Sequence, residues 1–247
     1  MKHLFFILFL WIAPAALVLG QVPAQYDEEV RFLLKNQYSV GVYASNAGWA
    51  ATGKRSLFKN IRVNRFIETD IAFLKHPKEI KNNNGSYSVV LPRGYVYGKL
   101  NSVYALRLGV GVERLVFEKG DKNGVEIRWK NSFGPTVALL KPVYLDIIVA
   151  PDSPPIVERY DPDRHFNENI FGKAPFFYGI DETKIKVGGY AKTALNFEFG
   201  KYDDEYRALE AGVCFDAFLS PIPMMVEIDN PPFFVSFFLA FQFGKRW

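Results

Sequence analysis

The chain has 247 residues, a formal net charge of +4, one cysteine and an aromatic fraction of 16%. Basic and acidic residues are scattered among one another, which excludes a nucleic-acid-binding patch, and a lone cysteine excludes an intramolecular disulfide. Beyond the N-terminal region no run reaches about 18 apolar residues, so no transmembrane helix is expected in the mature chain.

The first element in chain order is a predicted export signal. A basic start precedes an apolar run from Leu4 to Leu19, and small residues lead to a cleavage site near Gly20/Gln21, with a second possible site after Ala24. The run is too short for a retained membrane helix. The sequence therefore predicts a cleaved signal peptide over residues 1–20, an N-terminal segment over 21–36 and a β-domain over 37–247.

Alternation of apolar and polar side chains with a period of two recurs along the rest of the chain and is typical of β-strands. In one such segment Leu106 and Leu108 alternate with Arg107 and Gly109. The predicted strands cover residues 37–47, 61–74, 101–118, 124–138, 142–150, 184–201, 205–220 and 233–247.

The stretch between the first two predicted strands contains ATGKRS. It lacks the glycine spacing of a phosphate-binding loop and is interpreted as a connecting loop. Ten strands are expected if Ser86–Leu91 and Met224–Ile228 also pair into the sheet.

The last fifteen residues, FFVSFFLAFQFGKRW, alternate most clearly. Odd positions from Phe233 to Phe243 are apolar, whereas Ser236, Ala240 and Gln242 lie among the even positions. Strands in globular sheets are usually roughly five or six residues long. A strand of this length indicates that the side chains at its odd positions contact an extended apolar medium.

The opposite faces of the predicted strands carry charges of both signs, and Cys214 lies among them as a small filler. With eight strands, a barrel interior is only wide enough for side chains, so these charges are predicted to pair into a plug. Glu210 with Lys192, and Arg128 and Arg107 with Glu113, are the expected partners; a pore is the alternative. The charged positions are Arg62, Glu68, Asp70, Arg107, Glu113, Glu126, Arg128, Lys130, Lys192, Glu198, Glu210 and Asp216.

The connections between the predicted strands alternate in length at most links. In membrane barrels one end carries short turns and the other carries longer loops. Two links depart from this pattern: the short hairpin between the third and fourth strands, and the long connection from His76 to Leu100.

The predicted signal peptide, the alternating strands and the ending FQFGKRW resemble the small outer-membrane β-barrel proteins of Gram-negative bacteria. The aromatic content and GKRW ending are most similar to members from Bacteroidota. The resemblance implies an all-β, closed, antiparallel, transmembrane up-and-down barrel of about eight strands in the cell outer membrane. It also implies a periplasmic location for residues 21–36 and two partners: outer-membrane lipids, and the assembly machinery that reads the C-terminal aromatic strand.

Candidates for chemistry are few. His165 lies beside Asp161, Asp163 and Glu168, but no metal-binding spacing such as HExxH and no GxSxG elbow is present. No catalytic residue, cofactor site or metal site is therefore predicted. The long segment over residues 151–183 is the expected site for a protein partner, with Phe166, Phe171, Phe176, Phe177 and Tyr178 as contact surface.

These observations favour a non-enzymatic envelope, adhesion or secretion-complex component, with two alternatives left open. One is a soluble secreted lipocalin-like barrel, in which the aromatic residues of the last strand point inward around an apolar ligand. The other is an outer-membrane lipid-modifying enzyme that uses His165 with Asp161 or Glu168.

Overall fold

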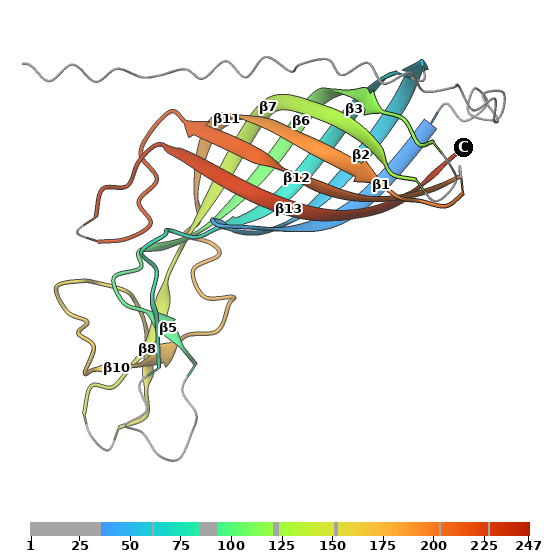
Figure 1. Ribbon diagram of the computed structural model, residues 1–247. Coiled ribbons are helices and arrows are strands. Elements are labelled where there is room, and N and C mark those ends of the chain that lie inside the picture. The colour runs from blue at the N-terminus through green and yellow to red at the C-terminus, as the bar shows by residue number, and fades with distance from the viewer. Residues whose placement is uncertain are drawn as a thin grey trace, which may run out of the picture.

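The computed structural model describes residues 36–60, 62–83, 93–120, 124–150, 153–202, 204–226 and 228–247. Eight strands close into a barrel, and a smaller lobe of short strands projects from one end of it (Figure 1). The barrel strands are β1 (Asn36–Ser45), β2 (Gly48–Asn60), β3 (Val63–Leu74), β6 (Asn101–Phe117), β7 (Glu126–Pro142), β11 (Lys184–Glu198), β12 (Glu205–Phe218) and β13 (Phe233–Arg246).

Every barrel strand pairs antiparallel with its neighbours in chain order, and β1 closes the ring against β13. The closing pair sets Val40 opposite Phe243 and Val42 opposite Phe241. The predicted fold class, a closed up-and-down barrel of eight strands, is therefore confirmed. The ten-strand option is wrong for Met224–Ile228, where Met225 forms only an isolated bridge to Lys99, and Ser86–Leu91 lies outside the described residues.

Two strand assignments from the sequence were wrong. One barrel strand was missed and one strand was wrongly placed in the barrel, so the predicted total of eight is still correct. The stretch interpreted as a loop is the barrel strand β2, whose outward face includes the small residues Ala51 and Gly53 and the charged Arg55. Apolar alternation fails there because this face is not uniformly apolar. The predicted strand 142–150 lies outside the barrel: β7 continues through Pro142, and residues 144–147 form β8 of the lobe.

With β2 in place, the lengths of the connections become regular. The three turns at the end that carries both barrel termini, 61–62, 118–125 and 199–204, are short. The long connections 75–100, 143–183 and 219–232 all lie at the opposite end, which also carries the tight β1–β2 turn. The two departures seen in the sequence came from the missed strand and the misplaced fifth strand.

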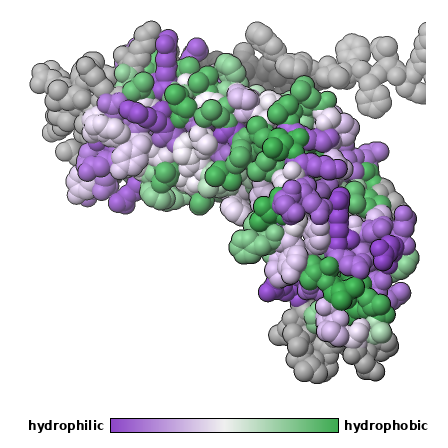
Figure 2. All heavy atoms as spheres, turned by 180° about the vertical axis from the view of Figure 1, so that it is seen from behind, coloured by the Kyte–Doolittle hydropathy of each residue, from purple (hydrophilic) through white to green (hydrophobic). Residues whose placement is uncertain are grey.

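The outer wall of the barrel is apolar along most strands, and Figure 2 shows green patches on the barrel, including one near its junction with the lobe. On β13, Phe237 is 63% exposed and Leu239 54% exposed, whereas the alternate residue Phe238 is 5% exposed. The odd face of the last strand therefore points outward, as the alternation indicated. In a lipocalin-like barrel these side chains point inward, so the geometry contradicts that alternative.

The lobe is built from two of the long connections. One sheet has the order β10 (Ile170–Lys173), β8 (Tyr144–Ile147), β9 (Ile156–Arg159), and β4 (Lys81–Asn82) pairs with β5 (Tyr95–Val96). The alternation read in 143–149 reflects burial in the lobe, because its core is formed by Tyr95, Val143, Leu145, Ile147, Tyr160 and Ile170. No helix in the described part of the chain is long and apolar enough to span a membrane.

Candidate functional site

The interior of the barrel holds a network of buried ion pairs. Arg107 of β6 donates from Nε and Nη2 to both carboxylate oxygens of Asp216 on β12, each at 2.7 Å. Its third nitrogen, Nη1, donates to the Tyr43 hydroxyl at 2.6 Å. Asp70 is close as well, at 3.9 Å from Nη1. A guanidinium that binds a carboxylate with two parallel hydrogen bonds is held in a defined orientation.

Lysine ammonium groups join the remaining acids in the middle of the barrel. Lys192 lies 2.7 Å from Asp70 and 3.1 Å from Glu68, and Lys130 lies 2.7 Å from Glu68 and 3.1 Å from Glu210. Glu68 therefore bridges two lysines from neighbouring strands. All five side chains are almost completely buried, so each charge depends on its partners for compensation.

The predicted plug of paired charges is confirmed, but several individual partners differ. Glu210 pairs with Lys130 rather than Lys192, and Arg107 pairs with Asp216. Glu113 is instead bound by Lys54, a residue of the missed strand β2. Two further predictions are corrected as follows: Arg62 is exposed in a turn, and Arg128 pairs with Glu126 on its own strand.

The end of the barrel nearer the lobe is closed by apolar side chains. In the connection 219–232, Ile222 and Met224 are fully buried and pack with Leu74, Val103 and Leu140. The carboxamide of Asn230 fixes this connection, because it accepts from the Met224 N–H at 2.7 Å and donates to the Met225 carbonyl at 2.9 Å. The described interior is thus filled by ion pairs and capped by a hydrophobic layer, which argues against the pore alternative.

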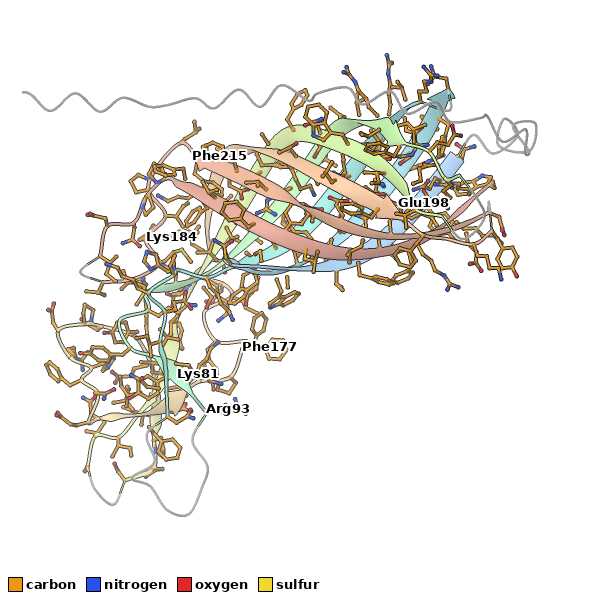
Figure 3. The ribbon with its side chains drawn as sticks, in the orientation of Figure 1. Lys81, Arg93, Phe177, Lys184, Glu198 and Phe215 are labelled. Carbon is orange, nitrogen blue, oxygen red and sulfur yellow. The ribbon has the colours of Figure 1, made fainter. Side chains whose placement is uncertain are left out.

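At the opposite end of the barrel, where Figure 3 shows Glu198, this carboxylate forms an ion pair with Arg246. Arg246 also donates from Nε to Gln37 at 2.9 Å, which joins β13 to β1 near the closure of the barrel. Cys214 is 1% exposed on the inner face, in agreement with its predicted role as a small filler.

His165 lies in the lobe, and the residue is 2% exposed. Its Nδ1 accepts a hydrogen bond from the Asp161 backbone N–H at 3.0 Å, and its Nε2 lies 3.1 Å from the Glu158 carboxylate. Both ring nitrogens therefore have hydrogen-bond partners within the segment 158–165. The predicted neighbours Asp163 and Glu168 are exposed, and the partner Glu158 was missed because it lies on β9, outside the motif considered. Among the described residues no group of three His, Cys, Asp or Glu side chains could hold a metal ion.

Aromatic residues of the segment 174–178 lie where the lobe meets the barrel. Phe176 packs edge-on against Tyr104 on the outer face of β6, with ring centroids 6.3 Å apart. Phe177 is 80% exposed and projects from this junction (Figure 3). Phe166 and Tyr178 are also exposed, so four of the five predicted contact aromatics lie on the surface, and Phe171 is partly buried.

A glycine fixes the path of this aromatic segment. Gly179 adopts a positive φ of 76°, and a Cβ atom there would lie 2.6 Å from the Tyr144 ring. Tyr144 in turn donates its hydroxyl hydrogen to Glu182, and this hydrogen bond raises the pKa of the phenol. On the other side of the aromatic residues, the Ala174 N–H donates to the Tyr144 carbonyl at 3.1 Å, so the segment is anchored to β8 both before and after them.

No protein-family model and no curated protein sequence matches this chain. Among solved structures, it is similar to Neisserial surface protein A, at 7% identity with a TM-score of 0.40, over 86% of this chain and 96% of that chain. It is similar to the N-terminal β-barrel domain of Pseudomonas aeruginosa OprF, at 8% identity and a TM-score of 0.37, over 87% and 98% of the two chains. It is also similar to Ail, the attachment invasion locus protein of Yersinia pestis, at 8% identity and a TM-score of 0.39, over 86% and 97%. At these identities and TM-scores the likeness carries no argument about the activity of this chain.

Proposed function

We propose that the protein is a non-enzymatic barrel of the bacterial outer membrane that acts through its lobe, as an adhesion, envelope or secretion-complex component. The observation that carries the proposal is an apolar outer wall on a closed barrel whose two longest connections build one folded lobe at a single end. Lipid offers no partners for an open sheet edge, so a closed ring of strands is the form of sheet that suits a membrane.

The dimensions of the wall support the membrane location. Transmembrane strands need about nine to eleven residues, and the barrel strands here have 10 to 17. The interior is polar where the outer wall is apolar, which is the opposite of a soluble β-sandwich. We therefore place both barrel termini and the short turns in the periplasm, and the lobe outside the cell. Residues 1–20 then act as the signal peptide.

The lobe supports a recognition role. It has its own apolar core, yet several of its large aromatic side chains remain exposed, with Phe177 the most accessible of them. Exposed aromatic residues on a folded scaffold are typical of protein interfaces. The geometry around His165 gives no support to a lipid-modifying reaction, because Asp161 contacts the ring through its backbone and the ring is buried.

A photo-crosslinking residue introduced at Phe177 should capture a protein partner on intact cells. Tyr202 is a matched control, because it is aromatic and 61% exposed but lies in a turn at the opposite end of the barrel. The same partner should not be captured from position 202. Capture of no protein from position 177 of an inserted barrel would contradict the protein-recognition role. A lipid A or phospholipid acyl pattern that depends on the gene and on His165 would favour the enzyme instead.

Replacing Phe237 with arginine should destabilise the inserted barrel by roughly 2–4 kcal/mol, because a charge near the bilayer midplane is costly. Tyr202→Arg should cost at most about 1 kcal/mol, since an interfacial arginine stays hydrated. Unfolding in urea from lipid vesicles measures both values, with the mobility difference between boiled and unboiled samples as the readout. Equal costs for the two variants, or a wild-type protein that is soluble without detergent, would contradict the membrane location.

A further inference from the structure

A cavity of about 230 Å³ lies where the lobe joins the barrel. Four lysines line it, and they come from four separate places in the chain: Lys75 just after β3, Lys81 in β4, Lys99 just before β6 and Lys173 at the end of β10. The fold therefore gathers these side chains around one space, although the sequence does not.

The charge of the cavity is poorly compensated. Glu79 is the one carboxylate among the lining residues, and it is already bound by Lys99 at 2.6 Å and by the His76 backbone N–H at 3.1 Å. Within the described residues, Lys75, Lys81 and Lys173 form no side-chain ion pair. Four ammonium groups against one carboxylate leave the cavity with a net charge of +3.

Lys99 is buried, whereas Lys75, Lys81 and Lys173 reach the solvent as well as the cavity. Lys99 is 7% exposed, and its ammonium lies 5.4 Å from the centroid of the Phe73 ring, which Lys75 approaches at 5.8 Å. Burial lowers the pKa of Lys99, and the positive charges of Lys173 and Lys75 act in the same direction against the opposing effect of Glu79. Like charges that converge in this way are a recurrent feature of sites whose ligand supplies the missing negative charge.

The wall of the cavity also orients Lys81. A Cβ atom at Gly94 would lie 2.3 Å from Cε of Lys81, so the absence of a side chain at position 94 makes room for the lysine stem. Val143 and Leu145 from the core of the lobe also line the cavity. The cavity thus offers several cations together with an uncharged surface.

We propose that this cavity binds a phosphate group carried by a small organic body. Lysine is a compact point charge that suits phosphate, whereas planar carboxylates are typically bound by the two-pronged guanidinium of arginine, and no arginine is among the described residues that line the cavity. The phosphate belongs either to a soluble metabolite such as a sugar phosphate or to a lipid headgroup at the adjacent membrane surface. The inference deepens the proposed function by naming a ligand class. It rests on that function in one respect: the lobe must lie outside the cell for the ligand to come from that side of the membrane.

The test uses the purified full-length protein in detergent micelles and in lipid nanodiscs. Each preparation tests one of the two sources of phosphate. In detergent micelles the probe is glucose 1-phosphate, measured by calorimetry. In lipid nanodiscs the comparison is between phosphatidylcholine alone and phosphatidylcholine with phosphatidic acid, measured by co-purification of the lipid. Binding in the first form indicates a soluble ligand, and enrichment of phosphatidic acid in the second indicates a headgroup.

Lys81→Gln combined with Lys173→Gln should weaken binding by about tenfold or more, because a hydrogen bond to a charged group contributes at least about that factor. Lys78→Gln combined with Lys201→Gln is the matched control, since both are exposed lysines outside the cavity, and it should change affinity less than about twofold. Equal losses in the two double variants, or no binding of either probe by a folded wild-type barrel, would overturn the site. A barrel that binds the probe but does not insert into membranes would instead overturn the proposed function.

Affinity for the bound probe should also fall as the pH rises, and the fall should begin below the ordinary lysine pKa. The phosphate favours the protonated form of Lys99, whose pKa in the free protein is already lowered by burial. Lys99 therefore loses its proton at a lower pH than an exposed lysine would. Glu79, Lys75 and Lys173 are the charged groups that face it, and the two lysines lose their charge in the same direction as the pH rises. An affinity independent of pH up to the ordinary lysine range would contradict a role for Lys99.

Discussion

Replacing Arg107 with methionine should destabilise the barrel by roughly 3–5 kcal/mol, because it leaves a buried carboxylate without its counter-charge. Arg107 is 1% exposed and binds Asp216 through two hydrogen bonds of 2.7 Å. Asp70 and Tyr43 also face its guanidinium, so the loss extends beyond a single pair. Urea unfolding of the protein reconstituted in vesicles measures the free energy of unfolding.

A double-mutant cycle separates the cost of the lost pair from the cost of the remaining charge. Asp216→Asn keeps the shape of the side chain but removes its charge, so combining it with Arg107→Met should recover a large part of the lost stability. Arg55→Met is the matched control, because Arg55 lies on the exposed outer face of β2. A double variant as unstable as the two single losses added together would show that the pair carries no coupling.

The faces of the strands could be predicted from the sequence, because alternation reports directly which side chains are buried. On β13 the outward and inward residues follow the pattern FFVSFFLAFQF without exception. The strand β2 could not be predicted, because its inner residues Thr52, Lys54 and Ser56 alternate with outer residues that are small or charged as well as apolar. The two faces therefore do not differ clearly in polarity. Alternation in 143–149 was real but could not say which sheet the strand belongs to, since a small lobe buries one face as a barrel does.

The chemistry of the interior was predictable only in outline. The sequence indicated buried charges of both signs, yet the partner of each charge depends on the register between strands, and register cannot be read from a single strand. Lys54 lies on the missed strand, and for this reason Glu113 was given other partners. The lysine cavity could not be predicted from the sequence, because its four lysines are spread along the chain from Lys75 to Lys173 and only the fold brings them together.

Deleting Phe243–Trp247 should abolish assembly of the barrel. These residues supply the pairs of Phe243 with Val40 and of Gly244 with Ser39, and two reciprocal backbone hydrogen bonds of 3.0 Å join Asn36 to Trp247. Without them the first half of β1 has no partner across the closure. Each unpaired backbone group costs several kcal/mol in lipid, so a barrel with such a gap is not stable in the membrane.

The same deletion removes Arg246, and with it the ion pair to Glu198 and the hydrogen bond to Gln37. Among the described residues, Lys119, at 3.5 Å, is then the one basic side chain that still forms an ion pair with the buried Glu198. The effect is therefore expected both from the open edge and from the uncompensated acid, apart from any reading of the aromatic terminus by the assembly machinery. The measurement is the amount of heat-modifiable protein in the outer-membrane fraction.

Two controls make this result specific to the barrel closure. Deleting the five residues Phe176–Ile180 removes the same length of chain from the lobe, outside the barrel, and should leave heat-modifiable protein in the membrane. Trp247→Phe keeps an aromatic C-terminus and the backbone pairing with Asn36, and it should assemble like the wild type. A tag placed after Trp247 should block assembly, since it hides the aromatic end. Normal insertion of the truncated chain would mean that neither the closing pairs nor the aromatic terminus is needed for assembly, and would contradict this prediction.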